Sequence, residues 1–258
     1  MKISYKIITT FIIILFTALF ITNLSLKAKY AEGDFNVPQP NKDDIFKQGD
    51  LDKKKLGNFK HLVINGAIIT KNNREVRFNP IFLISSGNTG NILGIKKNLN
   101  AILKTQILND TLYISFQKNT INEDNLRKAY FNRIIIQTKD LKSVNAKNTE
   151  CAIESIISGK PFSLTAESTY LNFGYINTNL LTLNIGTKSN ITINGYGTVN
   201  TLANVAPKIA NLNYTLGQGS SITIANKDLI EKINCLTPSK NIVEDYSKSL
   251  NIFNNSKL

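Results

Sequence analysis

Tryptophan is absent from this sequence, and histidine and methionine each occur once. Only two cysteines are present, Cys151 and Cys235, and their spacing fits no metal-binding motif. A Ser-His-acid or Cys-His catalytic site would have to use His61, the one histidine. Neither a Gly-x-Ser-x-Gly elbow nor a cysteine-rich motif accompanies it. We therefore interpret His61 as structural.

Acidic residues are also scarce, with 18 Asp and Glu against 31 Lys and Arg, which gives a net charge of +13. The lysines are scattered singly and form no basic stripe, so we predict no nucleic-acid partner. Between residues 141 and 226 the acids are Glu150, Glu154 and Glu167. A glycosidase needs two carboxylates at a defined separation. Glu154 and Glu167 occupy different positions in their segments, so we interpret them as solvated surface acids.

The remaining polar motifs predict no site either. Asp43, Asp44 and the acids of residues 50–52 lack the spacing of a calcium loop. Residues 87–91 resemble a flexible turn without the Gly-Lys-Ser/Thr of a phosphate loop. We predict no catalytic, cofactor-binding or metal-binding residue, no cofactor and no enzymatic activity. Three tyrosines would suit stacking on sugar rings if they are exposed: Tyr170, Tyr175 and Tyr196.

The N-terminal segment predicts export of the rest of the chain. Residues 7–26 form an uncharged, mainly apolar run, long enough for a membrane-spanning helix. Lys2 and Lys6 precede this run and favour a cytoplasmic N-terminus. We predict an uncleaved membrane helix, with the following domain in the periplasm as part of a single-pass inner-membrane protein. The alternative is a signal peptide cleaved after Ala28 or Ala31, which would release a secreted protein.

The rest of the chain divides into a linker, a strand-rich domain and a short C-terminal segment. We predict a membrane anchor at residues 1–29, a linker at 30–57, a β domain at 58–226 and a C-terminal tail or cap at 227–258. Strand patterns rich in Ile, Val, Leu and Phe dominate the β domain, which predicts an all-β fold.

Four segments of the β domain share a repeated apolar pattern. Residues 144–153 align with 164–173, and residues 183–193 align with 214–224. A period of about 20 residues, with short strands in each repeat, is typical of a β-solenoid. The alternative is an antiparallel sandwich with coincidental spacing. The pattern predicts a set of inward residues, namely Ala146, Ile153, Leu164, Phe173, Leu183, Ile193, Leu216 and Ile224.

The same elements resemble those of a known family. Residues 58–70, 109–116 and 134–148, followed by the Gly- and Ser-containing segments 186–195 and 217–224, are similar to the GIN domain, an auto-transporter adhesin head domain of bacterial envelope proteins. The resemblance implies a right-handed parallel β-helix with a role in adhesion or envelope structure. Where the family is rich in Gly-Ser pairs, this chain has Asn, Thr and Lys.

The sequence therefore predicts a non-catalytic envelope protein: an adhesin-like or structural β-helix domain outside the cytoplasm, preceded by a transmembrane helix. Its predicted partners are the membrane, through the N-terminal helix, and a polysaccharide or another envelope protein. The alternative is a carbohydrate-active enzyme, a lyase or hydrolase, on the same scaffold. The sequence leaves open whether Cys151 and Cys235 pair. We predict a set of outward positions as contacts, namely Asn145, Lys147, Thr165, Glu167, Asn184, Thr192 and Thr223.

Overall fold

The chain separates into two units in the computed structural model, Met1–Pro40 and Asn41–Leu258. The structure describes residues 15–17, 20, 51–69, 75–77, 81–86, 90–117, 133–195, 208–236 and 241–254. In the first unit the described residues are helical and exposed. No helix among the residues that the structure describes is long and apolar enough to cross a membrane. The structure therefore does not show the predicted transmembrane helix, most of whose residues in 7–26 lie outside the described ranges.

The second unit begins with short strands and a helical turn, α2 (Lys97–Asn100). Its first strands are β1 (Leu51–Lys55), β2 (His61–Asn65), β3 (Ala67–Ile69), β4 (Glu75–Arg77), β5 (Ile81–Ser86), β6 (Ile92–Lys96), β7 (Leu103–Leu108), β8 (Thr111–Phe116) and β9 (Arg133–Thr138). The strands that follow are β10 (Ser143–Lys147), β11 (Glu150–Gly159), β12 (Phe162–Glu167), β13 (Tyr170–Ile185), β14 (Asn190–Ile193), β15 (Lys208–Leu216) and β16 (Ser220–Ile224). After the 3₁₀ turn η2 (Lys227–Leu229) come β17 (Ile230–Cys235), β18 (Ile242–Tyr246) and β19 (Ser249–Asn254).

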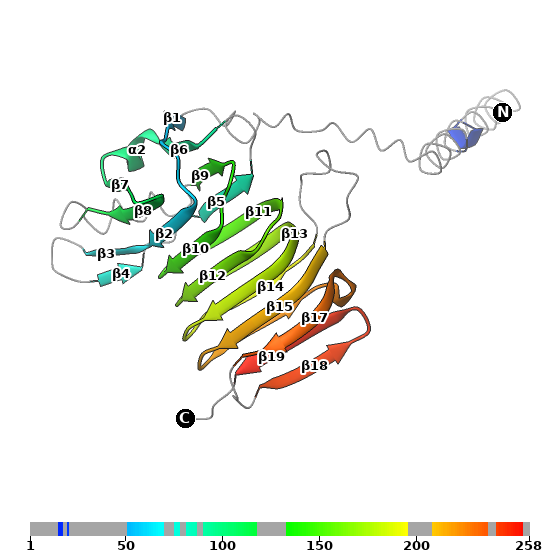
Figure 1. The fold of residues 1–258 in the computed structure, drawn as a ribbon. Coiled ribbons are helices and arrows are strands. Elements are labelled where there is room, and N and C mark those ends of the chain that lie inside the picture. Colours follow the sequence, from blue (N-terminus) through cyan, green and yellow to red (C-terminus); the bar gives the residue numbers. More distant parts are fainter. Residues whose placement is uncertain are drawn as a thin grey trace, which may run out of the picture. The chain divides into compact units, whose positions relative to one another are not determined.

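Seventeen of the described strands form one mixed sheet, and β3 and β4 form a second. Parallel pairs run through two series, β8-β2-β10-β12-β13-β15-β17 and β9-β5-β11-β13-β14-β16. The 16-residue strand β13 belongs to both series, its first part pairing with β14 and its last part with β12. The sheet therefore curls at β13, and its inner face encloses the core (Figure 1).

The predicted parallel β-helix is wrong. Antiparallel pairs join β1 to β6, β6 to β9 and β7 to β8 at one end, and β16 to β19 and β19 to β18 at the other. A β-helix repeats parallel pairing from one turn to the next, whereas this sheet is mixed and continuous. The all-β part of the prediction is correct.

The repeat alignment nevertheless predicted the register between segments. Val144 pairs with Leu164, Leu164 with Leu183, and Leu183 with Tyr214. Farther along, Ile153 pairs with Phe173. The aligned apolar residues therefore lie in columns on the inner face of the curled sheet.

Apolar side chains fill this inner face. All eight residues predicted to point inward are buried, and Phe173 has no exposed surface. Its ring packs edge-on against Phe162, with ring centroids 6.2 Å apart. Burial of such columns is the main stabilising contribution that a curled sheet of this kind gains on folding.

Stacked turns hold the successive strands in register. Asn148, Ser168, Lys188 and Gly219 each have a positive φ, in the turns after β10, β12, β13 and β15. The backbone amides of Asn148, Ser168 and Lys188 donate to the carbonyls of Glu167, Thr187 and Gln218 in the next turn.

Behind these turns runs a buried row of hydroxyl groups. Ser189 Oγ accepts from the Thr169 amide at 3.2 Å, and Ser220 Oγ accepts from the Ser189 amide at 2.9 Å. Thr169 Oγ1 lies 3.0 Å from the Ala146 carbonyl oxygen, to which it donates. Repetition of the same turn thus gives the hydroxyls of Thr169, Ser189 and Ser220 partners in neighbouring turns.

Candidate functional site

Two rows of uncharged polar side chains lie on the outer face of the sheet. One row crosses β2, β10, β12, β13 and β15, and the other crosses β10, β12, β13 and β15. Paired residues on neighbouring strands are about 4.8 Å apart. We call these nine residues the polar face, and they are His61, Ser143, Ser163, Thr182 and Asn213 in the first row, with Asn145, Thr165, Asn184 and Thr215 in the second.

Strand alternation positions the polar face. Each outer residue neighbours a buried one, as Asn145 neighbours Val144 and Thr165 neighbours Leu164. Because successive side chains of a strand point to opposite sides, a buried inner column fixes an outer column beside it. Asn145, Thr165 and Asn184 are exposed, and the other six residues are half-buried.

Hydrogen bonds link neighbours within the rows. His61 Nδ1 lies 2.7 Å from Ser143 Oγ, directly across the β2–β10 pair. Thr215 Oγ1 donates to Asn184 Oδ1 at 3.4 Å. Ser, Thr and Asn side chains both donate and accept hydrogen bonds. The rows can therefore offer both kinds of group to a ligand that lies along them.

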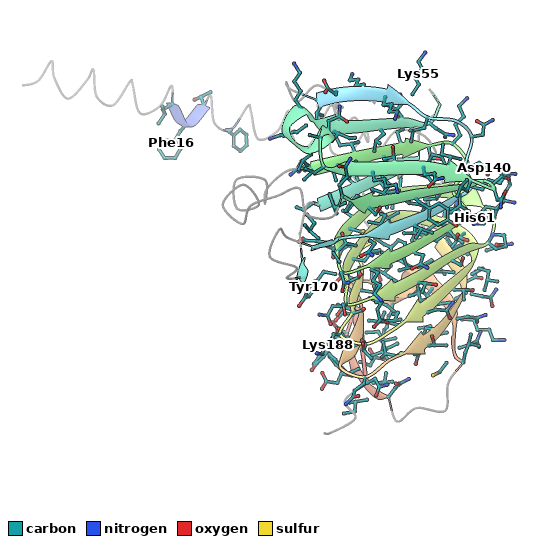
Figure 2. All side chains as sticks on the ribbon, turned by 90° about the vertical axis from the view of Figure 1, so that its left-hand side faces the viewer. Phe16, Lys55, His61, Asp140, Tyr170 and Lys188 are labelled. Atoms are coloured by element: carbon teal, nitrogen blue, oxygen red, sulfur yellow. The ribbon has the colours of Figure 1, made fainter. Side chains whose placement is uncertain are left out.

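Figure 2 shows the strands running from the margin marked by His61 and Asp140 to the margin marked by Tyr170 and Lys188. Near the second margin Lys147 and Glu167 pair across β10 and β12. Glu167 Oε1 accepts from Thr187 Oγ1 at 3.0 Å. A Cβ on Gly186 would contact Glu167 Oε2, so this carboxylate would have to move if Gly186 were replaced. Charged groups thus border the uncharged rows at the turns.

The His61–Ser143 pair has two elements of a nucleophilic site, a hydroxyl and an imidazole within hydrogen-bonding distance. Two nearby acids, Asp110, whose backbone carbonyl accepts from the His61 amide, and Asp140, three residues before Ser143, have other side-chain partners. Asp110 pairs with Lys60 at 3.0 Å, and Asp140 lies 3.6 Å from Lys160. Within the part of the chain that the structure describes, no three His, Cys, Asp or Glu side chains form a group that could hold a metal ion.

The remaining predicted contact positions lie on the other parallel series. Thr192 pairs with Thr223, and their neighbours along the same row are Asn172 and Asn251. In the adjacent row Ser221 Oγ donates to Asn190 Oδ1 at 2.7 Å. We call the row formed by Asn172, Thr192, Thr223 and Asn251 the β14 row. It offers the same chemistry, but it belongs to a different part of the curled sheet from the polar face.

Other residues singled out in the sequence do not form a common site. Glu154 is half-buried; desolvation raises its pKa, and the nearby charge of Arg133 opposes this rise. Tyr170 is exposed, and partial burial raises the pKa of Tyr175. Tyr196, Asp43 and Asp44 lie outside the described residues.

The two cysteines are free in the structure, with Cys151 buried and Cys235 exposed. Burial raises the pKa of the Cys151 thiol to about 12, although a hydrogen bond with Thr149 opposes the rise. Cys151 is therefore a neutral thiol within the apolar core.

The first row of the polar face was missed by sequence reasoning. Ser143, Ser163, Thr182 and Asn213 each stand one residue before the first residue of an aligned segment. Extension of the same alignment by one position towards the N-terminus would have found them. His61 completes the row through a pairing between residues 82 positions apart, for which the repeat gives no signal.

No family model matches this chain, and no curated protein matches it. The chain is similar in fold to solved structures of bacterial proteins. One, described as a candidate lipid-binding protein from Parabacteroides distasonis, is 13% identical with a TM-score of 0.41, over 73% of this chain and 78% of that one. A candidate adhesin from Parabacteroides merdae is 16% identical with a TM-score of 0.40, over 73% and 78%. A candidate adhesin from Bacteroides fragilis is 10% identical with a TM-score of 0.41, over 65% and 77%.

The resemblance to the GIN domain family is not confirmed by these comparisons and stays a prediction.

Proposed function

We propose that this protein is a non-catalytic binding protein of the cell envelope, whose polar face binds a neutral polysaccharide. The observation that carries the proposal is the in-register, uncharged arrangement of the nine polar-face residues across five parallel strands. Serine, threonine and asparagine match the hydroxyl groups of a sugar, since both partners donate and accept hydrogen bonds.

The regular spacing favours a polymer over a small molecule. Sites for small ligands enclose most of the ligand surface. A row that repeats at each strand instead offers the same contact many times, so a chain of repeated sugar units would add many weak contacts. The backbone hydrogen bonds of the sheet fix the rows before binding, which lowers the entropic cost of association.

The absence of charge within the polar face argues for neutral ligands. None of the nine residues is Lys, Arg, Asp or Glu. Phosphate backbones are bound largely through Lys and Arg, so the proposal does not include a nucleic acid. Export of the folded unit is part of the proposal, because the apolar sequence of residues 7–26 fits an export signal.

The proposal is tested by affinity electrophoresis of the full chain in gels that contain a neutral β-linked glucan or a mannan. Alanine at Asn145, Thr165 and Asn184 should weaken retardation by about tenfold or more, since three exposed hydrogen-bonding groups are lost. The matched control is a variant with alanine at Asn172, Thr192 and Thr223 of the β14 row. This variant should bind as the unsubstituted chain does. Equal loss in both variants, or no retardation of the unsubstituted chain by any neutral polysaccharide, would contradict the proposal.

The competing function is a carbohydrate-active or acyl-cleaving enzyme that uses Ser143 and His61, because these two side chains are hydrogen-bonded. It is separated from binding by product analysis with the same polysaccharides and with acetylated sugars. We expect no turnover. Saturable release of product that Ser143→Ala abolishes, in a variant that keeps its thermal unfolding transition, would replace the binding proposal with the enzyme.

A further inference from the structure

Strand β1 forms one edge of the sheet and is strongly basic. Among the described strands it pairs with β6 alone, with Lys54 opposite Leu93 and Lys55 opposite Ile92. Lys53, Lys54 and Lys55 are exposed, and Asp52 is the one acid of the strand. Lys97, in α2 directly after β6, is exposed as well. This edge therefore presents a concentrated positive charge.

Strand β18 forms another edge, at the opposite end of the same unit (Figure 1). Within the described part of the sheet it pairs with β19 alone, and all five of its residues are exposed. Glu244 and Asp245 make the strand acidic. Ile242, Val243 and Tyr246 are 49%, 56% and 55% exposed, so the strand also offers apolar surface.

From these two edges we propose that copies of this chain associate head to tail, with β18 of one copy adding to the sheet beside β1 of the next. An exposed strand edge offers backbone amide and carbonyl groups that can pair with a second strand. The charges of the two edges are complementary, since β1 carries three lysines and β18 carries two carboxylates. Because successive side chains of a strand point to opposite faces, Lys54 and Lys55 can cover Ile242 and Val243 on the two faces with their aliphatic stems, and the lysine on the face of Ile242 can also reach Glu244 with its ammonium group.

The same charges disfavour symmetric pairing. Two β1 strands side by side would bring six lysines together, and two β18 strands would bring together four carboxylates. Like charges placed opposite each other destabilise a strand pair. Lysine on an edge strand also discourages unspecific pairing, so an acidic edge is the partner that β1 accepts best. A contact between different surfaces of identical copies gives an open chain unless its rotation closes a ring.

Contacts within β18 and its surroundings indicate which of its two carboxylates is available to pair with a lysine of the next copy. Asp245 is already paired with Lys227, with Oδ1 2.7 Å from Nζ. Glu244 accepts the hydroxyl of Tyr246 at 2.8 Å and has no cation among its described hydrogen bonds. Glu244 is therefore the acid to which a lysine of the next copy adds the most, and it can be changed without breaking the Lys227 pair.

The proposal is tested by sedimentation velocity of the full chain in a non-ionic detergent at low and high salt. We expect oligomers at low salt that dissociate as salt screens the charges. The basic-edge variant Lys54→Glu, Lys55→Glu and the acidic-edge variant Glu244→Lys, Asp245→Lys should each associate about tenfold or more weakly. An equimolar mixture of the two variants should associate again, because each reversed edge then faces its complement.

Two controls keep the test decisive. Lys104→Glu, Lys142→Glu makes the same change in net charge as the basic-edge variant at exposed lysines outside β1, and it should associate as the unsubstituted chain does. Glu244→Lys alone retains the Asp245–Lys227 pair and covers the case in which the double substitution unfolds the end of the sheet. A monomeric unsubstituted chain at low salt, or edge variants that self-associate normally, would overturn the proposal. Failure of the mixture to associate would overturn it too.

Discussion

Apart from β3 and β4, the strands of residues 143–224 and of residues 51–138 belong to one sheet, but the two regions satisfy their hydrogen bonds in different ways. In the first region parallel strands stack in register, and the buried hydroxyls of Thr169, Ser189 and Ser220 have partners in neighbouring turns. Thr149, at the start of this stack, instead hydrogen-bonds with Cys151. In the second region parallel and antiparallel pairs alternate. There Ser85 Oγ and Thr138 Oγ1 are buried without a hydrogen-bond partner among the described atoms.

The difference shows what repetition contributes. From Thr169 to Ser220 each turn copies the one before, so each of these hydroxyls lies within hydrogen-bonding distance of a backbone group in a neighbouring turn. Where parallel and antiparallel pairs are mixed, the turns do not repeat, so each buried polar group needs a hydrogen-bond partner of its own. A buried group without a partner lowers the stability of the fold. Apolar burial, in contrast, is equally complete in both regions, since Phe82 and Phe173 both have no exposed surface.

The largest expected effect tests whether apolar burial is equally complete in the two regions. Phe173→Ala should lower the free energy of unfolding by about 3–5 kcal/mol, through lost burial and the cavity left beside Phe162. Phe82→Ala should cost a similar amount in the other region. Thr165→Ala, on the outer face of β12, should cost less than about 1 kcal/mol. Urea denaturation of the three variants measures these values. Equal midpoints for Phe173→Ala and Thr165→Ala would show that the inner and outer faces are misassigned.

A matched pair of substitutions tests how much the buried hydroxyls of the two regions contribute to stability. Thr169→Val removes a buried, hydrogen-bonded hydroxyl at nearly constant volume and should destabilise by about 1–3 kcal/mol. Thr138→Val removes a buried hydroxyl without a described partner, so it should be neutral or slightly stabilising. Thermal and urea unfolding of both variants give the comparison. If both cost the same, the contrast between the two regions does not extend to their polar groups.

The smallest effect depends on pH and concerns Cys151, in the regular region. Its folded pKa of about 12 lies above its ordinary value near 9, so the unfolded chain loses the thiol proton first as pH rises. The stabilisation is complete well below pH 9 and is lost progressively between about pH 9 and pH 12. The stability of Cys151→Ala relative to the unsubstituted chain should therefore improve by about 1 kcal/mol from pH 9 to pH 10. Urea denaturation with a reductant measures this difference, and a constant difference would mean that the thiol is not buried.

Local sequence patterns were sufficient to predict the apolar columns and the pairing of the repeated segments. Alternation along each strand and a spacing of about 20 residues fix which residues face inward and which residues lie opposite each other. All eight predicted core residues are buried for this reason. The second row of the polar face follows from the same pattern, since Asn145, Thr165 and Asn184 stand between inward residues.

How the remaining strands join the sheet was evident from the folded structure and not from the sequence. Periodicity does not encode whether β6, β7 or β19 runs parallel or antiparallel to its neighbour, because both arrangements bury the same alternating side chains. The predicted β-helix extended the local repeat to a whole domain and was wrong at both ends. The contact of His61 with Ser143 also required the fold, since a hydrogen bond between residues far apart in sequence depends on strand order, which the local sequence does not specify.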